Sequence, residues 1–254
     1  MGLFDLTGKT AVVTGSTRGI GRAIAEEMAR AGARVVVSGR KQEACDAVAA
    51  EIRKAGGDAV GIACHIGDKA QVKALVTKAR AAFDRIDILV LNAATNPAYG
   101  PLAEVSDEAF DKTMAVNVHS QLWLCAQVLP EMAARKDGAI VFIASIGGFR
   151  GSRNLGAYAI SKAAIMQTAR SLAGEWSPHN IRINCVAPGL IRTDFSRALI
   201  ENKEVLASRL ATTPLGRVGE PIDVVGAVIL LASDAGRFIT GQSIVVDGGT
   251  TIAG

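Results

Sequence analysis

Cysteine, histidine and aromatic side chains are scarce in this sequence of 254 residues. The four cysteines are widely spaced and form no C-x-x-C pair: Cys45, Cys64, Cys125 and Cys185. Three of them stand in apolar stretches, which predicts small buried side chains rather than disulfides or metal ligands. The three histidines also lack the spacing of a metal site: His65, His119 and His179. No metal centre is therefore predicted.

Long apolar runs and clusters of one charge are absent as well. No run approaches the roughly 18 residues that a membrane span requires. The first residues, MGLFD, have neither the basic region nor the apolar core of a secretory signal, and the last, TIAG, match no retention or peroxisomal signal. The net charge of +4 is modest and the basic residues are dispersed, so no nucleic-acid surface is predicted. We expect a soluble cytoplasmic protein without a membrane or nucleic-acid partner.

Glycine and short apolar runs, in contrast, are abundant. The apolar runs predict seven strands at 10–14, 34–37, 59–64, 86–91, 139–143, 182–186 and 243–246. Amphipathic segments between them predict helices that begin near residue 20 and at 42–54, 69–83, 107–134, 156–176 and 221–232. The strands are continuously apolar, as strands covered on both faces are. The sequence therefore predicts one α/β domain over residues 1–254, built on a doubly wound parallel sheet with helices on both faces.

The first predicted strand leads into a glycine-rich turn with the sequence TGSTRGIG at residues 14–21. Glycine lets the backbone turn sharply and approach a ligand closely, and the following helix offers its positive N-terminus to phosphates. The spacing G-x-x-x-G-x-G differs from the usual dinucleotide fingerprint G-x-G-x-x-G. Because the turn follows the first strand of a serial strand–helix pattern, we interpret it as a dinucleotide phosphate loop rather than a structural turn.

The end of the second strand indicates which dinucleotide is bound. An acidic residue there would bind the ribose 2′-hydroxyl of NAD, whereas an arginine would accommodate the 2′-phosphate of NADP. This chain has Ser38-Gly39-Arg40-Lys41, without a carboxylate, and a second arginine, Arg18, in the glycine-rich turn. The alternative is that both arginines are solvated surface charges. We predict NADP(H), because two guanidiniums can hold one phosphate through charge-assisted hydrogen bonds.

A hydroxyl, a phenol and an ammonium are predicted to converge at the same edge of the sheet. Ser145 follows the fifth apolar run, so it lies at the carboxyl end of a strand, where ligands bind in open α/β sheets. Tyr158 and Lys162 stand one turn apart on one face of the 156–176 helix. A pair of exposed helical residues and a capping serine is the structural alternative. Beside a cofactor loop, however, the three groups indicate proton transfer coupled to hydride transfer.

The ordered set of motifs resembles the short-chain dehydrogenase/reductases over essentially the whole chain. The matching features are the glycine loop, Asn92-Ala93-Ala94, Asn117, Ser145, the Y-x-x-x-K pair and Pro188-Gly189. Within the family, the segments CHIG at 64–67 and NAATNP at 92–97 are most similar to the dehydrogenase/reductase member 4 group. That group comprises NADP-dependent carbonyl reductases and retinol dehydrogenases, and the β-ketoacyl-acyl-carrier-protein reductases are next. The resemblance implies a single Rossmann-type domain.

The resemblance also implies the roles of individual residues. The catalytic set would be Asn117, Ser145, Tyr158 and Lys162. Tyr158 would be the general acid/base, Ser145 would hydrogen-bond the substrate oxygen, Lys162 would hold the nicotinamide ribose, and Asn117 would anchor a water leading from Lys162 to solvent. Lys162 and oxidised nicotinamide are expected to lower the pKa of Tyr158 below the ordinary value of about 10. The cofactor residues would be Gly15, Ser16, Thr17, Arg18, Gly19, Ile20, Gly21, Gly39, Arg40, His65, Ile66, Asn92, Ala93, Ala94, Tyr158, Lys162, Pro188, Gly189, Ile191 and Thr193.

Two positions depart from the family pattern. Ala94 replaces the last glycine of Asn-Asn-Ala-Gly, and its methyl group narrows the cofactor cleft without removing a donor. His65 stands where an aspartate commonly contacts the adenine amino group. Its imidazole either stacks on the adenine or hydrogen-bonds it, or it is simply a histidine at a strand end. Neither departure falls on a catalytic residue.

The segment 194–213 is polar and helical in pattern, and proline residues bound it on both sides, which suits a mobile lid over the substrate. A static surface helix is the alternative. Candidate residues for the substrate wall are mostly apolar, and none is a carboxylate: Asn96, Tyr99, Phe149, Asn154, Leu190 and Phe195. A small neutral ketone or aldehyde, or the matching alcohol, is therefore the expected substrate.

Three further readings concern function and assembly. A 3-oxoacyl-acyl-carrier-protein reductase would need a basic patch for its acidic carrier, which Arg150, Arg153, Arg192 and Arg197 can supply. A non-catalytic NADP-binding sensor or scaffold is disfavoured because the complete catalytic set is present. The family resemblance implies a homotetramer. Apolar residues along the 107–134 helix agree with it, since one sheet cannot cover all of them: Val116, Val118, Leu122, Leu124 and Val128.

Overall fold

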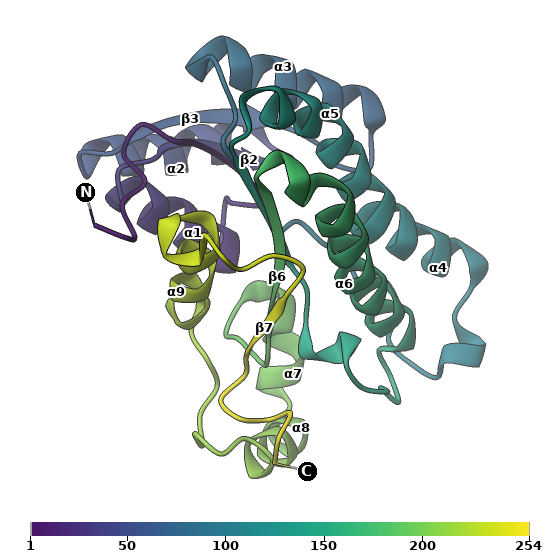
Figure 1. Cartoon of the computed structure of the whole chain (residues 1–254). Coiled ribbons are helices and arrows are strands. Elements are labelled where there is room, and N and C mark those ends of the chain that lie inside the picture. Colours follow the sequence, from purple (N-terminus) through teal and green to yellow (C-terminus); the bar gives the residue numbers. More distant parts are fainter. Residues whose placement is uncertain (1, 254) are drawn as a thin grey trace.

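Seven parallel strands form the centre of the computed structural model, which describes residues 2–253 (Figure 1). The strands are β1 (Thr10–Thr14), β2 (Arg34–Gly39), β3 (Asp58–Ala63), β4 (Ile88–Leu91), β5 (Gly138–Ile143), β6 (Ile181–Pro188) and β7 (Ser243–Val246). They are ordered β3-β2-β1-β4-β5-β6-β7 across the sheet, and every pairing is parallel. The order reverses between β1 and β4, so the predicted Rossmann-type doubly wound sheet is confirmed.

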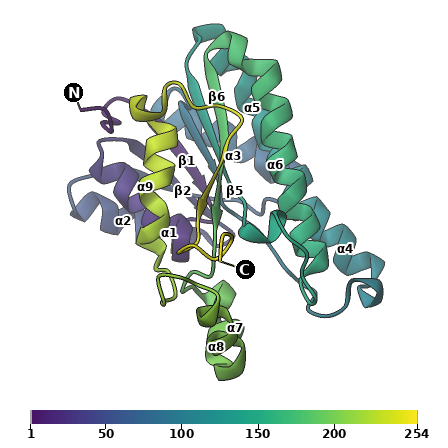
Figure 2. The same ribbon diagram turned by 60° about the horizontal axis from the view of Figure 1, so that its bottom comes forward.

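Helices cover both faces of the sheet (Figure 2). They are α1 (Gly19–Arg30), α2 (Gln42–Lys54), α3 (Lys69–Phe83), α4 (Asp107–Met114), α5 (Ser120–Arg135), α6 (Gly156–Trp176), α7 (Arg197–Glu201), α8 (Lys203–Ala211) and α9 (Pro221–Ala232). Short 3-10 turns are η1 (Leu102–Glu104), η3 (Ile146–Gly148), η4 (Ser177–His179), η5 (Asp194–Ser196) and η6 (Asp234–Gly236). Helices α1, α2 and α9 pack on one face, and α3, α5 and α6 pack on the other.

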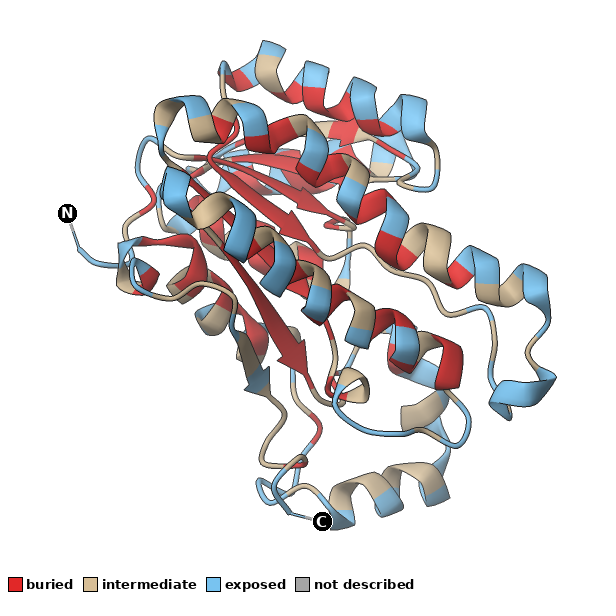
Figure 3. Cartoon of the chain, turned by 45° about the vertical axis from the view of Figure 1, so that its right-hand side comes forward, coloured by how far each residue is buried: buried red, intermediate tan, exposed pale blue. Residues whose placement is uncertain are grey.

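The two hydrophobic cores lie between the sheet and these helical layers. Strands β1, β4 and β5 are buried along their whole length, as the red strands of Figure 3 show. Alternate residues of one strand contribute to opposite cores, so that Val12 packs on the α3–α5–α6 side while Val13 packs on the α1–α2–α9 side. Burial on both faces is the reason that these strands read as continuous apolar runs.

The helix predicted at 107–134 is confirmed, and it contains a π-helical turn that the sequence did not predict. Helix α4 ends at Met114, a π-helical turn η2 (Ala115–His119) follows, and α5 begins at Ser120. The buried side chain of Asn117 lies in this turn and forms hydrogen bonds with the backbone N–H and C=O of Thr95. A π-turn inserts an extra residue and re-aims a side chain, and such turns are frequent at functional sites.

The predicted helical character of 194–213 is confirmed, but it is divided. The segment contains η5, α7 and α8, and it extends beyond the carboxyl ends of the strands (Figure 2). Asn202 separates the two helices by capping α8, where its side chain accepts a hydrogen bond from the N–H of Val205. Asp194, at the start of the segment, is ion-paired with Arg18 of the glycine-rich turn.

The four cysteines are buried with free thiols, which includes the three that stand in apolar stretches. Between residues 2 and 253, no helix has both the length and the apolar character needed to cross a bilayer. Over the same residues, no group of three or more His, Cys, Asp or Glu side chains is arranged to hold a metal ion.

Candidate active site

The carboxyl ends of β1, β4, β5 and β6 bring the predicted motifs to one edge of the sheet. The glycine-rich turn follows β1, Asn92 follows β4, Ser145 follows β5, and Gly189 follows β6. Because β1 and β4 are neighbours at the point where the strand order reverses, the turn and Asn92 face each other across the crevice where doubly wound sheets bind ligands.

Glycine is required at two kinds of position in the turn. Gly15 and Gly19 have φ angles of 64° and 56°, in the left-handed region that favours glycine. Gly21 is excluded from carrying a side chain, because a Cβ there would lie 2.3 Å from the carbonyl oxygen of Gly15. Asn92 fixes the same turn: its Nδ2 donates to the carbonyl oxygens of Thr14 and Gly15, each at 3.0 Å.

The start of α1 fits the pyrophosphate of a dinucleotide. Arg18 is the N-cap residue and forms no side-chain capping hydrogen bond, and the first turn of α1 holds no acidic residue. The first N–H groups of the helix are therefore free of side-chain partners and of local negative charge, which is the arrangement that binds phosphate. Ser16 does not share this role, because its hydroxyl and N–H bond Val13 and Ser38 within the chain.

The glycine-rich turn, which carries Arg18, approaches the end of β2, which Arg40 follows. A Cβ at Gly39 would stand 2.7 Å from Cγ2 of Thr17, so the two segments are in close contact. Arg40 is exposed at the end of β2, and no carboxylate stands between Ser38 and Lys41. Arg18 is exposed as well, and its Nη1 donates to Oδ2 of Asp194 at 3.1 Å.

Another group of predicted cofactor residues follows β3 and β4. His65 is exposed after β3, and its N–H donates to Oε1 of Gln71. Ile66 and Ala94 are partly buried. The N–H groups of Asn92 and Ala93 both donate to Oγ1 of Thr14, a buried residue that the sequence analysis did not single out.

Ser145, Tyr158 and Lys162 come together as predicted. The hydroxyl of Ser145 lies near that of Tyr158 and lowers the pKa of the phenol. Lys162 lies one turn further along α6, with its Nζ 5.4 Å from the centroid of the Tyr158 ring. This ammonium is fully buried and donates to the carbonyl oxygen of Ile143 at 2.7 Å. The three groups therefore line one side of the crevice, and the backbone of β5 holds Lys162 in place.

The pKa of Tyr158 does not follow the sequence-based expectation in the chain alone. Burial raises the pKa of this phenol to about 12, and the hydrogen bond with Ser145 opposes the shift. Burial also lowers the pKa of Lys162 to about 8, against a smaller opposite effect of Cys185. Desolvation disfavours the charged forms of both side chains.

Asn117 is joined to the start of α6 rather than to Lys162. Besides its two bonds with Thr95, its Nδ2 donates to Oγ of Ser161 at 3.0 Å, and that hydroxyl donates to the carbonyl oxygen of Tyr158. Asn117 thus connects the loop after β4 with the turn that carries Tyr158. The parts played by Thr95 and Ser161 could not be foreseen, since ordinary threonine and serine residues give no local signal.

The loop after β6 approaches the glycine-rich turn from the other side. Pro188 ends β6, and a Cβ at Gly189 would lie 2.8 Å from the Asp247 backbone. Ile191 is buried and pairs with Gly219 in a short parallel bridge. A Cβ at Gly19 would stand 3.2 Å from Cγ2 of Thr193, so Thr193 lies close to the predicted phosphate loop.

Some of the candidate substrate-wall residues form contacts within the chain. The ring of Phe195 lies on that of Tyr158, with centroids 5.8 Å apart and an interplanar angle of 41°. The hydroxyl of Tyr99 accepts a hydrogen bond from Nδ2 of Asn154 at 3.3 Å. Phe149 is half exposed, and Asn96 keeps a buried Oδ1 without a partner in residues 2–253.

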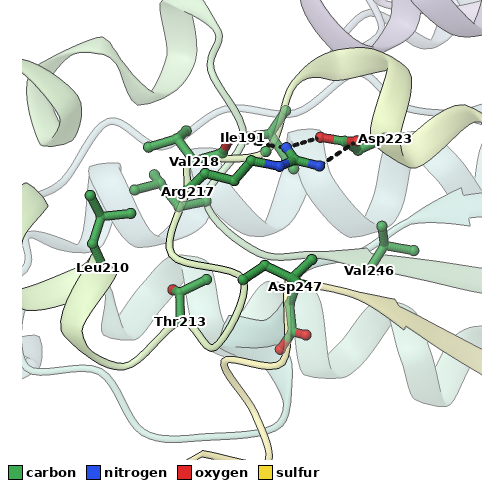
Figure 4. Close-up of a pocket in the computed structure, with 12 residues that line it drawn as sticks. Ile191, Leu210, Thr213, Arg217, Val218, Asp223, Val246 and Asp247 are labelled. Atoms are coloured by element: carbon green, nitrogen blue, oxygen red, sulfur yellow. Dashed lines mark hydrogen bonds and ion pairs between the residues drawn. The ribbon is translucent and has the colours of Figure 1, made fainter.

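A cavity of about 220 Å³ opens between the loop after β6, the end of α8 and the loop after β7 (Figure 4). Leu190 and Ile191 line it, together with Leu210, Thr213, Leu215, Arg217, Val218, Gly219, Asp223, Val246, Asp247 and Gly248. Arg217 and Asp223 form an ion pair at its wall. None of the four predicted catalytic residues lines it, so the cavity adjoins the crevice through Leu190 and Ile191 but is not its centre.

Known proteins with similar sequences and structures place these features in a family. A family model described as enoyl-(acyl carrier protein) reductase matches residues 15–251. Dehydrogenase/reductase SDR family member 4 of Pongo abelii is 44% identical over 245 residues, which cover 96% of this chain and 88% of that protein. The resemblance to the member 4 group is thus confirmed.

Solved structures agree with this placement. A gluconate 5-dehydrogenase from Burkholderia cenocepacia, in complex with NADP and tartrate, superposes with a TM-score of 0.95 at 33% identity, covering 99% of this chain and 98% of that one. A 7α-hydroxysteroid dehydrogenase complexed with NADH and 7-oxo glycochenodeoxycholic acid gives 0.93 at 36% identity, covering 97% and 96%. The chain belongs to the short-chain dehydrogenase/reductase family of oxidoreductases.

Proposed function

We propose that this protein is an NADP(H)-dependent oxidoreductase that interconverts a ketone or aldehyde and the corresponding alcohol. The observation that carries the proposal is the convergence of Ser145, Tyr158 and the buried Lys162 at the sheet edge that also holds the glycine-rich turn. A proton donor and a dinucleotide site at one edge are what carbonyl reduction requires.

Tyr158 acts as the general acid/base in this proposal. In reduction it gives its proton to the developing alkoxide, and Ser145, which lies near the phenol, donates a second hydrogen bond to the same oxygen. A phenol is protonated at neutral pH, which is the form that reduction needs. Lys162 holds the nicotinamide ribose and, when charged, favours the phenolate left behind. Asn117 anchors a water that links Lys162 to bulk solvent.

The bound nicotinamide supplies or accepts the hydride. The turn at 15–21 and the loops at 92–94 and 188–193 hold the dinucleotide, with His65 and Ile66 beside the adenine. Arg18 and Arg40 select the 2′-phosphate, because both are exposed and no carboxylate at the end of β2 would repel it. NADP and NADH are both found with relatives, so the selection depends on these two residues of this chain.

The substrate is a small neutral carbonyl compound in this proposal, and 194–213 forms a lid over it. Phe195 supports the lid assignment because its ring already lies on Tyr158. Asn96, Tyr99, Phe149, Asn154 and Leu190 complete the wall. The single domain assembles as a homotetramer.

Replacing Tyr158 with Phe tests the proposal directly. We expect turnover of any carbonyl substrate to fall by at least about 10²–10⁴-fold, while NADPH binding, followed by fluorescence titration, is retained. A panel of aryl ketones, aldehydes and keto acids, with NADPH or NADH oxidation as the readout, identifies the substrate. Undiminished turnover in the variant, or equal use of both cofactors by the natural chain, would refute the corresponding part of the proposal.

A second candidate is a reductase of 3-oxoacyl groups on acyl carrier protein, and the description of the matching family model names the same carrier with a different reaction, enoyl reduction. Of the four arginines proposed for the carrier, Arg192 is paired with Glu220 and Arg197 with Asp194. The exposed Arg150 and Arg153 remain beside Phe149. A higher kcat/KM for an acetoacetyl thioester than for every simple ketone would establish this candidate. NADPH binding without turnover of any carbonyl would instead indicate a sensor or scaffold.

A further inference from the structure

The glycine-rich turn and the proposed lid are joined by an ion pair. Nη1 of Arg18 donates to Oδ2 of Asp194 at 3.1 Å, across 176 residues of sequence. Arg18 is the N-cap of α1, and Asp194 is the first residue of η5, where the 194–213 segment begins. Both side chains reach solvent, with exposed fractions of 68% and 42%, so a phosphate group can approach either of them.

Two other contacts fix Asp194 in front of Arg18. Thr193 and Ser196 form a capping box that sets the conformation of the η5 turn. Thr193 also packs against the glycine-rich turn, since a Cβ on Gly19 would meet its Cγ2 at 3.2 Å. The carboxylate of Asp194 contacts Arg197 in addition to Arg18. It therefore keeps one cationic partner when the other is withdrawn.

Arg18 thus has two competing anions, provided that it binds the 2′-phosphate as the proposed function states. We propose that Asp194 is a specificity-determining residue: it competes with the 2′-phosphate of NADP(H) for Arg18, and the phosphate releases the start of the lid from the glycine-rich turn. A phosphate monoester carries more negative charge than a carboxylate and accepts bidentate hydrogen bonds from a guanidinium. NAD(H) has no such phosphate and leaves the ion pair intact.

The expected effect of Asp194 on affinity is small but selective. Exposed ion pairs contribute little free energy because water and salt screen them. Removing the carboxylate should therefore tighten NADPH binding by about two- to fivefold, and it should leave NADH binding unchanged. A general electrostatic effect would instead change the affinity for both cofactors, because both carry the pyrophosphate.

Binding titrations of Asp194→Asn test this selectivity. The ligands are NADPH, NADH, adenosine 2′,5′-bisphosphate and adenosine 5′-monophosphate, measured at low and high salt. We expect tighter binding only of the two ligands with a 2′-phosphate, and a gain that shrinks at high salt. Glu175→Gln, which removes an exposed carboxylate at the far end of α6, is the control and should change none of the four affinities. An equal change for all ligands, or none, would overturn the inference.

The same titrations in an Arg18→Ala background separate this inference from the proposed function. If Arg18→Ala weakens NADPH binding but Asp194→Asn still tightens it in that background, the competition for Arg18 is refuted and NADP selection by Arg18 stands. If Arg18→Ala leaves NADPH binding unchanged, the proposed cofactor assignment fails and the inference fails with it. The expected result is that the effect of Asp194→Asn disappears when Arg18 is absent.

Hydrogen exchange tests the release of the lid without any catalytic turnover. Adenosine 2′,5′-bisphosphate occupies the adenosine side only, so it does not touch the substrate region. We expect it to accelerate exchange in residues 194–201 of the natural chain, relative to adenosine 5′-monophosphate. In Asp194→Asn these residues should exchange at one rate with either ligand. Equal exchange with both ligands in the natural chain would show that the ion pair does not hold the lid.

Discussion

At the scale of single residues, Lys162 is a side chain whose burial lowers the stability of the folded protein. Its ammonium is fully buried, with a carbonyl oxygen as its hydrogen-bond partner and no carboxylate partner in the described part of the chain. Burial lowers its pKa from 10.5 to about 8, because keeping the charged form away from water costs free energy. Residues that impose such a cost are retained for function, and removing them commonly stabilises a protein.

Lys162→Met should therefore stabilise the fold while abolishing activity. The pKa shift corresponds to roughly 3 kcal/mol, and losing the bond to Ile143 offsets about 1 kcal/mol of it, so a gain of about 2 kcal/mol in the free energy of unfolding is expected at pH 7. Between pH 8 and 10.5 the unfolded chain binds more protons than the folded chain at this site. The natural chain therefore becomes more stable relative to the variant as pH rises, and the difference in the free energy of unfolding should shrink.

Urea denaturation at pH 7 and pH 10 measures this difference. Lys112→Met, which replaces an exposed lysine of α4, is the control and should show no comparable gain at either pH. A loss of stability in Lys162→Met at pH 7 would mean that the hydrogen bond to Ile143 outweighs the burial of the charge.

Gly21 is the glycine whose replacement the structure tolerates least. A Cβ there would lie 2.3 Å from the Gly15 carbonyl oxygen and 2.4 Å from Nδ2 of Asn92. Gly21→Ala should reduce the free energy of unfolding by about 1–3 kcal/mol and weaken dinucleotide binding, because the turn itself must shift. Gly226→Ala in α9 is the matched control: nothing lies within 4 Å of its Cβ, so a gain of about 0.5–1 kcal/mol is expected. Thermal unfolding and NADPH titration of both variants check the prediction.

At the scale of elements, the sequence predicted those strands and helices that leave a regular pattern of apolar residues. All seven strands and most helices lie within a few residues of their expected ranges, because burial on both faces leaves continuous apolar runs. The π-turn at 115–119 escaped prediction, since its residues suit an α-helix equally well. Within this turn Asn117 contacts Thr95, 22 residues away in the sequence. The Arg18–Asp194 ion pair was not predicted either, because two side chains that only folding brings together leave no local pattern in the sequence.

Asn117→Ala tests whether the π-turn holds the loop after β4 in place. The change leaves the backbone N–H and C=O of Thr95 and the hydroxyl of Ser161 without their partner. We expect a loss of roughly 2–3 kcal/mol in the free energy of unfolding, together with weaker NADPH binding, as the 92–95 loop loosens. If Asn117 served only to anchor a water, kcat and its solvent isotope effect would change while stability and cofactor affinity would not.

At the scale of the whole molecule, the structure alters the evidence for a tetramer. Three of the apolar residues that the sequence suggested as subunit contacts are buried within the chain itself: Val118, Leu124 and Val128. Some of the exposed apolar side chains lie on two separate faces. Leu122 of α5 and Ile160 of α6 are 37% and 40% exposed on the helical layer. Ile222, Phe238 and Val245 are exposed around α9 and β7, which is an edge strand of the sheet.

Two self-complementary faces generate a tetramer with two kinds of dimer interface, so each face should be separable by mutation. Leu122→Arg with Ile160→Arg places charges on the α5–α6 face and should leave dimers joined through α9 and β7. Phe238→Lys with Val245→Lys charges the edge of the sheet, where unpaired strands otherwise associate, and should leave dimers joined through α5 and α6. All four changes together should give monomers. Sedimentation velocity at several concentrations distinguishes the species, and a natural chain that sediments as a monomer would refute the assembly.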